Sequence, residues 1–282
     1  MAGRKAQPLT DRWRYAGEAL HRHWARLHLG DREPWPDARQ VSAHARHGAL
    51  AEMVAAHGGA STVAHELQQA WREFHAGQFA DAIRRGGALG PLGAPAANKA
   101  AEVQLLHGKP DTSAALKALS AAIERGEAAV TELPDYPNAH YMLALVLGRY
   151  GQRISIVKAL AAGLAGRIRA GLERTLELEP RHAEAHLAFG LYHAAIVAQL
   201  GALAGRLSYG VSRDAALEHL GRAARLAPAL PIVHIEHAHG LLLLDSARYR
   251  EEAGALYRRA TECEPLDASE ELDVRRARRG LP

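Results

Sequence analysis

The chain has 282 residues, of which 48% are apolar and only 5% aromatic, a balance that favours helices packed closely through small side chains. The formal net charge is +4, and the Arg residues are scattered among Asp and Glu, so the charge pattern argues against nucleic-acid binding. The single cysteine excludes an intramolecular disulfide, and no apolar run approaches the roughly 18 residues of a membrane-spanning helix.

Residues 1–58 are predicted to form a helical extension ahead of the main domain. The basic N-terminus lacks the apolar run of a secretory signal, so we expect a cytoplasmic protein. Three apolar residues recur at helical spacing, namely Leu20, Trp24 and Leu27. The prolines of residues 31–37 then require a loop, and a helical pattern resumes over residues 41–57.

Residues 63–132 are predicted to contain further helices. The helix over 63–76 is followed by Gly77, which permits a left-handed turn, and then by an aromatic and small residues that let two helices approach. We expect a loop over residues 86–95, where glycines and prolines are concentrated. The next helices are predicted over residues 96–107 and 112–132.

From residue 131 onward the chain repeats itself. The stretch TELPDYPNAHYMLALVLG has counterparts in LELEPRHAEAHLAFGLY and ARLAPALPIVHIEHAHGL. In each, a helix ends at a proline and a new helix opens with regularly spaced small residues. The closing prolines are Pro134, Pro180, Pro228 and Pro265. A unit that recurs every few tens of residues is one supersecondary element stacked on copies of itself.

This pattern resembles the tetratricopeptide repeat (TPR) over about residues 67–272. The resemblance implies an all-α, TPR-like superhelical solenoid of antiparallel helix pairs, here residues 59–282, with a C-terminal capping helix that is rich in arginine. The chain is similar to TPR proteins of the TRAP-transporter T-component and regulator-of-microtubule-dynamics type. It is closer still to a bacterial group that carries PNAHYxxAxxLGRY and HAEAHxAxGxYHA. The resemblance implies a fold and does not imply a microtubule or transporter role.

The repeats are longer than a standard TPR. Successive closing prolines are 46, 48 and 37 residues apart, against a standard period of about 34. The excess lies between the two helices of a pair, over residues 150–166 and 194–212, where apolar residues keep helical spacing. We therefore expect lengthened helices that form tall hairpins. Residues 154–168 are also basic and could lie on a membrane surface, but packing of a lengthened helix explains the apolar pattern better.

The 17 histidines raise the question of a metal site. His239 lies about 140° from His234 around a helix, so the cluster of His234, His237 and His239 cannot converge on one ion. His182 and His186 could share an ion, but two ligands fall short of the four of a structural zinc site. Histidines recur at one packing position in three successive repeats, at His140, His186 and His234. We expect no metal, no cofactor and no catalytic residue.

In TPR proteins, the first helices of the repeats line a concave groove, and this face is the predicted binding site. By this resemblance the groove carries Asn138, Tyr141, Leu145 and Arg149 from one repeat, Glu184, Leu187, Leu191 and Ala195 from the next, and Ile232, Ile235, His239 and Leu242 from the third. The face is mainly apolar and lacks the Lys/Asn/Arg clamp with which some TPR domains bind a terminal carboxylate. An apolar groove requires a cover, which is a partner's helix, an apolar ligand or residues 9–57 of this chain.

The sequence therefore predicts a non-catalytic protein–protein interaction scaffold or adaptor that uses this groove. The expected partner is a protein that contributes an amphipathic helix or an extended peptide, and neither nucleic-acid binding nor membrane insertion is expected. One alternative is a carrier that holds a small apolar ligand in a cavity between the tall hairpins. Another alternative is a metal protein or enzyme built from the histidines.

Overall fold

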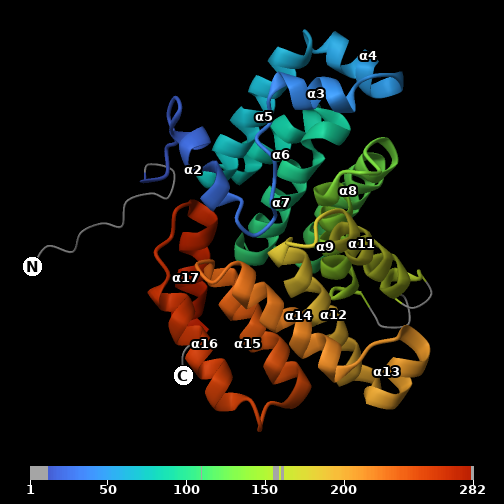
Figure 1. The fold of residues 1–282 in the computed structure, drawn as a ribbon, viewed down its shortest axis with the longest axis vertical. Helices are drawn as coiled ribbons and strands as arrows, with labels where there is room; N and C mark the ends of the chain where they lie inside the picture. The colour runs from blue at the N-terminus through green and yellow to red at the C-terminus, as the bar shows by residue number, and fades with distance from the viewer. Residues whose placement is uncertain (1–11, 109, 155–158, 160–161, 281–282) are drawn as a thin grey trace, which may run out of the picture.

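The computed structural model describes residues 12–108, 110–154, 159 and 162–280, and every regular element within them is a helix (Figure 1). The predicted all-α fold is confirmed, because antiparallel helices pack as successive pairs. The pairs are α5–α6 (Ala60–His75 and Phe79–Ala88), α7–α8 (Gly90–Gly108 and Thr112–Glu132), α9–α11 (Pro137–Gly151 and Leu164–Leu178), α12–α14 (Ala183–Leu200 and Arg213–Leu226) and α15–α16 (Pro231–Asp245 and Arg250–Glu262). The short helix α13 (Ala202–Tyr209) stands between α12 and α14, and α17 (Ala268–Gly280) follows the last pair.

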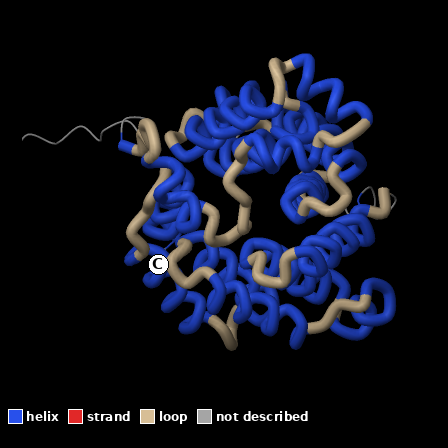
Figure 2. The backbone as a smooth tube through the Cα atoms, turned by 45° about the horizontal axis from the view of Figure 1, so that its top comes forward, coloured by secondary structure: helices blue, strands red, loops and turns tan. Residues whose placement is uncertain are grey.

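The N-terminal part contributes α2 (Ala19–Leu27), α3 (Ala38–His44) and α4 (Gly48–Ala56). The spacing of Leu20, Trp24 and Leu27 correctly predicted the buried face of α2. The helical stretch expected over residues 41–57 is two helices instead of one. Between α2 and α3 the chain forms the predicted loop, and we call residues 28–36 the strap, because they cross the middle of the molecule (Figure 2).

The row of helix pairs closes into a ring, because α17 packs against both α15 and α5 (Figures 1 and 2). Leu266 and Leu272 share a hydrophobic core with Trp24, Trp71 and Phe74 from the N-terminal half. The capping helix α17 is therefore buried along one side between the two ends of the row, where Ala268, Val274 and Ala277 are almost inaccessible.

The loop predicted over residues 86–95 is wrong. Helix α6 continues to Ala88 and α7 begins at Gly90, with Pro95 inside it. The glycines serve close packing, since a Cβ on Gly93 would lie 2.1 Å from the carbonyl oxygen of Gly86. Glycine was interpreted as a turn former where it is required for the contact between two helix backbones.

The tall hairpins are only partly built as expected. Helix α12 reaches Leu200, but Gly201 then takes a φ of 81° and a separate helix, α13, follows. The other hairpin tip falls partly outside the described residues, at residues 155–158 and 160–161. Among the helices of the described part, none is both long enough and apolar enough to cross a bilayer.

The contact between α12 and α14 provides a test of the repeat register. A Cβ on Gly190 would lie 2.7 Å from Leu220 Cγ and 3.1 Å from the carbonyl oxygen of Ala216, so Gly190→Leu should lower stability by about 1–3 kcal/mol or more. The matched change Gly166→Leu, on an exposed face of α11 with no atom within 4 Å of the added Cβ, should have little effect. Chemical denaturation of both variants measures the difference, and equal stabilities would show that the register is wrong.

Candidate functional site

A buried ionic cluster holds the strap inside the ring, and Lys99 of α7 is its centre. The Lys99 ammonium lies 3.0 Å from Glu184 Oε1 of α12 and also contacts Asp31 Oδ2 of the strap. The side chains of Asp31, Lys99 and Glu184 are exposed by only 0%, 14% and 14%. One cation thus joins the strap to two different helix pairs. A lone charge among the alanines of residues 94–101 was the sequence signal for such a buried partner.

The strap also hydrogen-bonds to side chains and backbone of the predicted groove. Asn138 Nδ2 donates to the Asp31 carbonyl oxygen at 3.1 Å, and the backbone N–H of Glu184 donates to the Gly30 carbonyl oxygen at 3.0 Å. The Glu33 carboxyl lies 2.6 Å from Tyr136 Oη and also contacts Asn138 Nδ2. Two residues predicted to bind a partner, Asn138 and Glu184, therefore bind this chain's own strap.

A chain of imidazoles and carboxylates joins the strap to the ring closure. His28 Nδ1 lies 2.9 Å from Asp31 Oδ1, and His28 Nε2 lies 3.2 Å from His75 Nε2. His75 Nδ1 in turn lies 2.7 Å from Asp267 Oδ2, at the start of α17. Burial lowers the pKa of His28 to about 4, even though Asp31 favours the charged form. The strap and α17 are thus connected through buried, hydrogen-bonded groups.

The pKa values of the cluster follow from burial and from its one shared cation. Burial disfavours the charged form of Lys99, but Asp31 and Glu184 outweigh it and raise its pKa. For Asp31, Lys99 and His28 outweigh burial and lower the pKa. Burial, reinforced by the charge of Asp31, raises the pKa of Glu33 to about 8. The cavity beside Glu33 and Tyr136 measures only about 10 Å³, which holds no more than about one water molecule.

Three other residues of the predicted groove, Tyr141, Leu187 and Ile235, are also buried within this chain. Tyr141 is buried, with its ring 4.5 Å from that of His182. Leu187 belongs to a core with Leu230 and Leu29, and Ile235 belongs to another with Ala260 and Ala277. Ile232 and Leu242 are half-buried, and His239 is exposed and lies 3.3 Å from Glu236. The strap and α17 therefore cover much of the face that the repeat pattern assigned to a partner.

The remaining predicted groove residues line an open apolar recess. Leu145, Arg149, Leu191 and Ala195 border a recess of about 480 Å³ between α9, α11, α12 and α13. Most of the other lining side chains are apolar, among them Leu164, Ile168, Ile196 and Leu200. Arg149 is neutralised there by Glu102, whose Oε1 lies 2.8 Å from Arg149 Nε. The structure thus divides the predicted groove into a covered part and an open part.

Three exposed leucines belong to the end of α12 and to α13, two helices that contribute residues to this recess. Leu200, Leu203 and Leu207 are 37%, 74% and 79% exposed, and they are the exposed large apolar side chains of the described residues. Leu200 also lines the recess, whereas Leu203 and Leu207 extend from α13 outside its lining. We call the recess together with these three leucines the hairpin-tip surface. Sequence reasoning assigned these leucines to packing between lengthened helices, because their spacing is helical.

The recurring histidines are part of the repeat itself. Nε2 of His140, His186 and His234 donates to the carbonyl oxygen of the closing prolines Pro134, Pro180 and Pro228, at 2.8, 3.1 and 2.8 Å. His182 caps α12, since its Nδ1 accepts from the backbone N–H of Ala185 at 3.0 Å. Within the described residues, no three His, Cys, Asp or Glu side chains are placed to hold a metal ion.

Comparison with solved structures identifies a similar fold. The crystal structure of a thermophilic TPR protein from Thermus thermophilus matches with a TM-score of 0.54 and 20% sequence identity, over 76% of this chain and 98% of that chain. This likeness shows that the fold is a TPR-like helical repeat. No protein-family model matches the sequence, and no curated protein does.

The ionic cluster predicts a large effect of removing its cation. Lys99→Met would leave Asp31 and Glu184 buried without a counter-charge, and should destabilise the protein by about 3–5 kcal/mol. The exposed Lys117 of α8 provides the control, because Lys117→Met removes the same charge from the surface. Urea unfolding distinguishes the two, and a Lys99 variant as stable as the control would contradict the role of the cluster.

The raised pKa of Glu33 predicts that stability falls as the pH rises from about 4.5 through 8. Its pKa is raised from 4.5 to about 8 in the folded protein, so the folded state retains a proton that the unfolded state has lost. Its contribution is complete below pH 4.5 and disappears as the pH rises through 8, with about 1 kcal/mol lost between about pH 7 and 9. Glu33→Gln should flatten this slope, and Glu52→Gln on the exposed face of α4 should not. Melting curves across this range test it, and parallel slopes in all three proteins would refute it.

Proposed function

We propose that this chain is a non-catalytic interaction module that binds a protein partner at the hairpin-tip surface through an amphipathic helix of that partner. The observation that carries the proposal is the position of the exposed leucines beside the open recess. Clustered apolar area on a protein surface marks interaction sites, and a helix that lies in a groove inserts residues spaced three or four apart.

Two further observations support a non-catalytic role at this surface. The titratable groups that would suit catalysis, Lys99, Glu33 and Asp31, are buried around the strap, and the cavity next to Glu33 is about one water in size. The open recess instead has mostly aliphatic lining, with the Arg149 guanidinium paired to Glu102. Binding by shape and apolar contact is what such a lining can do.

A carrier of a small apolar ligand is the second candidate, favoured by the size of the recess. About 480 Å³ falls within the range of roughly 300–1,000 Å³ that is typical of small-molecule sites. A small ligand in the recess would leave Leu203 and Leu207 exposed, because these side chains do not line it. A helix laid across the recess would cover them, and for this reason we favour a protein partner.

Selection from a phage-displayed library of helical peptides against the full chain tests the proposal. Recovered peptides should be amphipathic. Their affinity should fall at least about tenfold in the double variant Leu203→Ser/Leu207→Ser, since each buried leucine contributes about 1.5–3 kcal/mol. Ala195→Trp, which fills the recess, should weaken binding of these peptides as well. Helical content and melting temperature of both variants are the controls.

The carrier predicts a different pattern in the same variants. An apolar dye such as Nile red would bind the wild-type protein and the leucine double variant equally well. It would not bind the Ala195→Trp variant, in which the tryptophan fills the recess. Peptides that bind the leucine variant as well as they bind the wild type would show that the hairpin-tip surface is not the working site.

A further inference from the structure

The segments that form the hairpin-tip surface carry no acidic residue. Residues 136–172 and 185–213 lack Asp and Glu altogether, although the whole chain contains 31 of them. The described residues of these segments include several basic ones, which are Arg149, Arg153, Arg167, Arg169, Arg206 and Arg213. The described residues of these segments thus combine the exposed leucines with charge of one sign.

Part of this positive charge has no counter-charge within the described residues. Arg167 contacts Glu127 of the neighbouring α8, and Arg169 lies 2.8 Å from Glu173 on its own helix, α11, so both charges are neutralised. Arg153 directly follows the recess-lining Gln152 and is half-exposed. Arg206 lies on α13 between Leu203 and Leu207 and is exposed. Neither Arg153 nor Arg206 forms an ion pair with another described residue.

We propose that the partner helix at the hairpin-tip surface is acidic, with Asp or Glu flanking an apolar stripe. This inference rests on the proposed function and adds the charge of the partner. The apolar stripe would enter the recess and cover the leucines, and the flanking carboxylates would face Arg206 and Arg153. Carboxylates placed opposite unpaired guanidinium groups form charge-assisted hydrogen bonds and steer association.

The lining of the recess favours a helix over the acyl chains of an anionic lipid surface. Gln152 and Gln199 contribute polar side chains to the lining, and an acyl chain would cover them without offering hydrogen-bond partners. Tyr192 also lines the recess, and its buried hydroxyl has no hydrogen-bond partner among the described residues. A peptide supplies donors and acceptors next to its apolar side chains, whereas a lipid tail does not.

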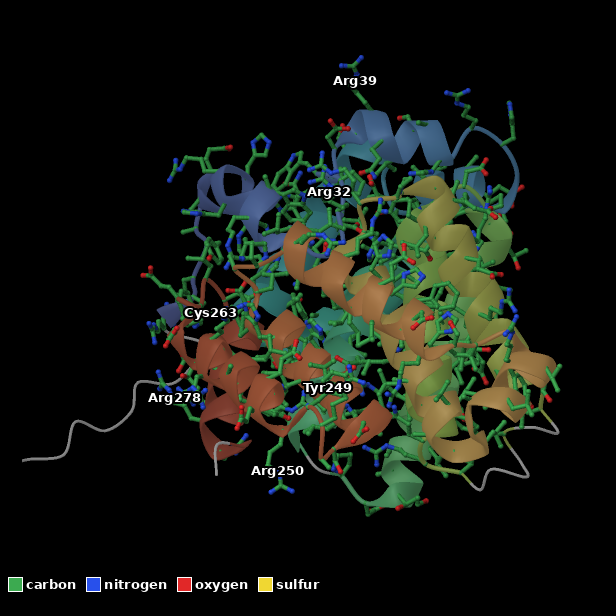
Figure 3. All side chains as sticks on the ribbon, turned by 60° about the horizontal axis from the view of Figure 1, so that its bottom comes forward. Arg32, Arg39, Tyr249, Arg250, Cys263 and Arg278 are labelled. Carbon is green, nitrogen blue, oxygen red and sulfur yellow. The ribbon has the colours of Figure 1, made fainter. Side chains whose placement is uncertain are left out.

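Two synthetic helical peptides with the same leucine face test this inference, one with Glu and the other with Lys on the polar face. Fluorescence anisotropy with the full chain should show at least about tenfold tighter binding of the Glu peptide, and this advantage should shrink as salt is raised. Arg153→Glu/Arg206→Glu should reverse the preference. The matched control is Arg39→Glu/Arg250→Glu, since these exposed arginines extend from α3 and α16 into solvent at opposite ends of the view in Figure 3.

Each alternative outcome contradicts either the acidic partner alone or the proposed function as well. Equal binding of the two peptides, both weakened by Leu203→Ser/Leu207→Ser, would overturn the acidic partner and leave the proposed function standing. Failure of both peptides to bind would overturn the proposed function as well. Binding instead to vesicles of anionic phosphatidylglycerol, lost in the leucine and arginine variants and absent with phosphatidylcholine, would identify the surface as a lipid-binding one and refute a protein partner.

Discussion

The rest of the structure depends on the two buried ion pairs that the Lys99 ammonium forms. A buried carboxylate is tolerated only where a cation or hydrogen-bond donors compensate it, and Lys99 compensates Asp31 of the strap and Glu184 of α12 together. The strap is therefore an interior part of the ring, and not an appendage. Because the strap also accepts hydrogen bonds from groove residues, the concave face that a TPR-like repeat normally presents is largely occupied by this chain itself.

Local chemistry explains which parts of the fold were predictable. The closing prolines and the recurring histidines act within one repeat, and each histidine contacts a proline carbonyl only six residues away. The packing role of Gly190 followed from the same pattern, since it touches the partner helix of its own pair. The loop expected over residues 86–95 failed because glycine has two uses. A turn and a helix–helix contact both require the absence of a side chain, and composition does not distinguish them.

Long-range contacts explain what was not predictable. His75 meets Asp267 across 192 positions of sequence, and the strap meets α9 and α12 across more than one hundred. The periodicity of apolar residues along the sequence does not indicate such long-range contacts. The groove prediction assigned Asn138, Glu184 and Leu187 to a partner, whereas in the structure they contact residues of this chain itself. A sequence pattern can identify a face that must be covered, although it cannot tell an internal cover from an external one.

The extra residues of two consecutive repeats bear on where a partner could bind. Insertions in repeat proteins gather on one side of the stack, which is often the binding side. Here the second insertion supplies α13, and two of its leucines are mostly exposed, whereas leucines that only lengthened the packed helices would be buried. The strap and α17 cover much of the predicted groove, and the apolar recess that is open among the described residues lies where the groove meets the inserted residues. Under the proposed function, the strap that stabilises the ring would also direct a partner to the hairpin-tip surface.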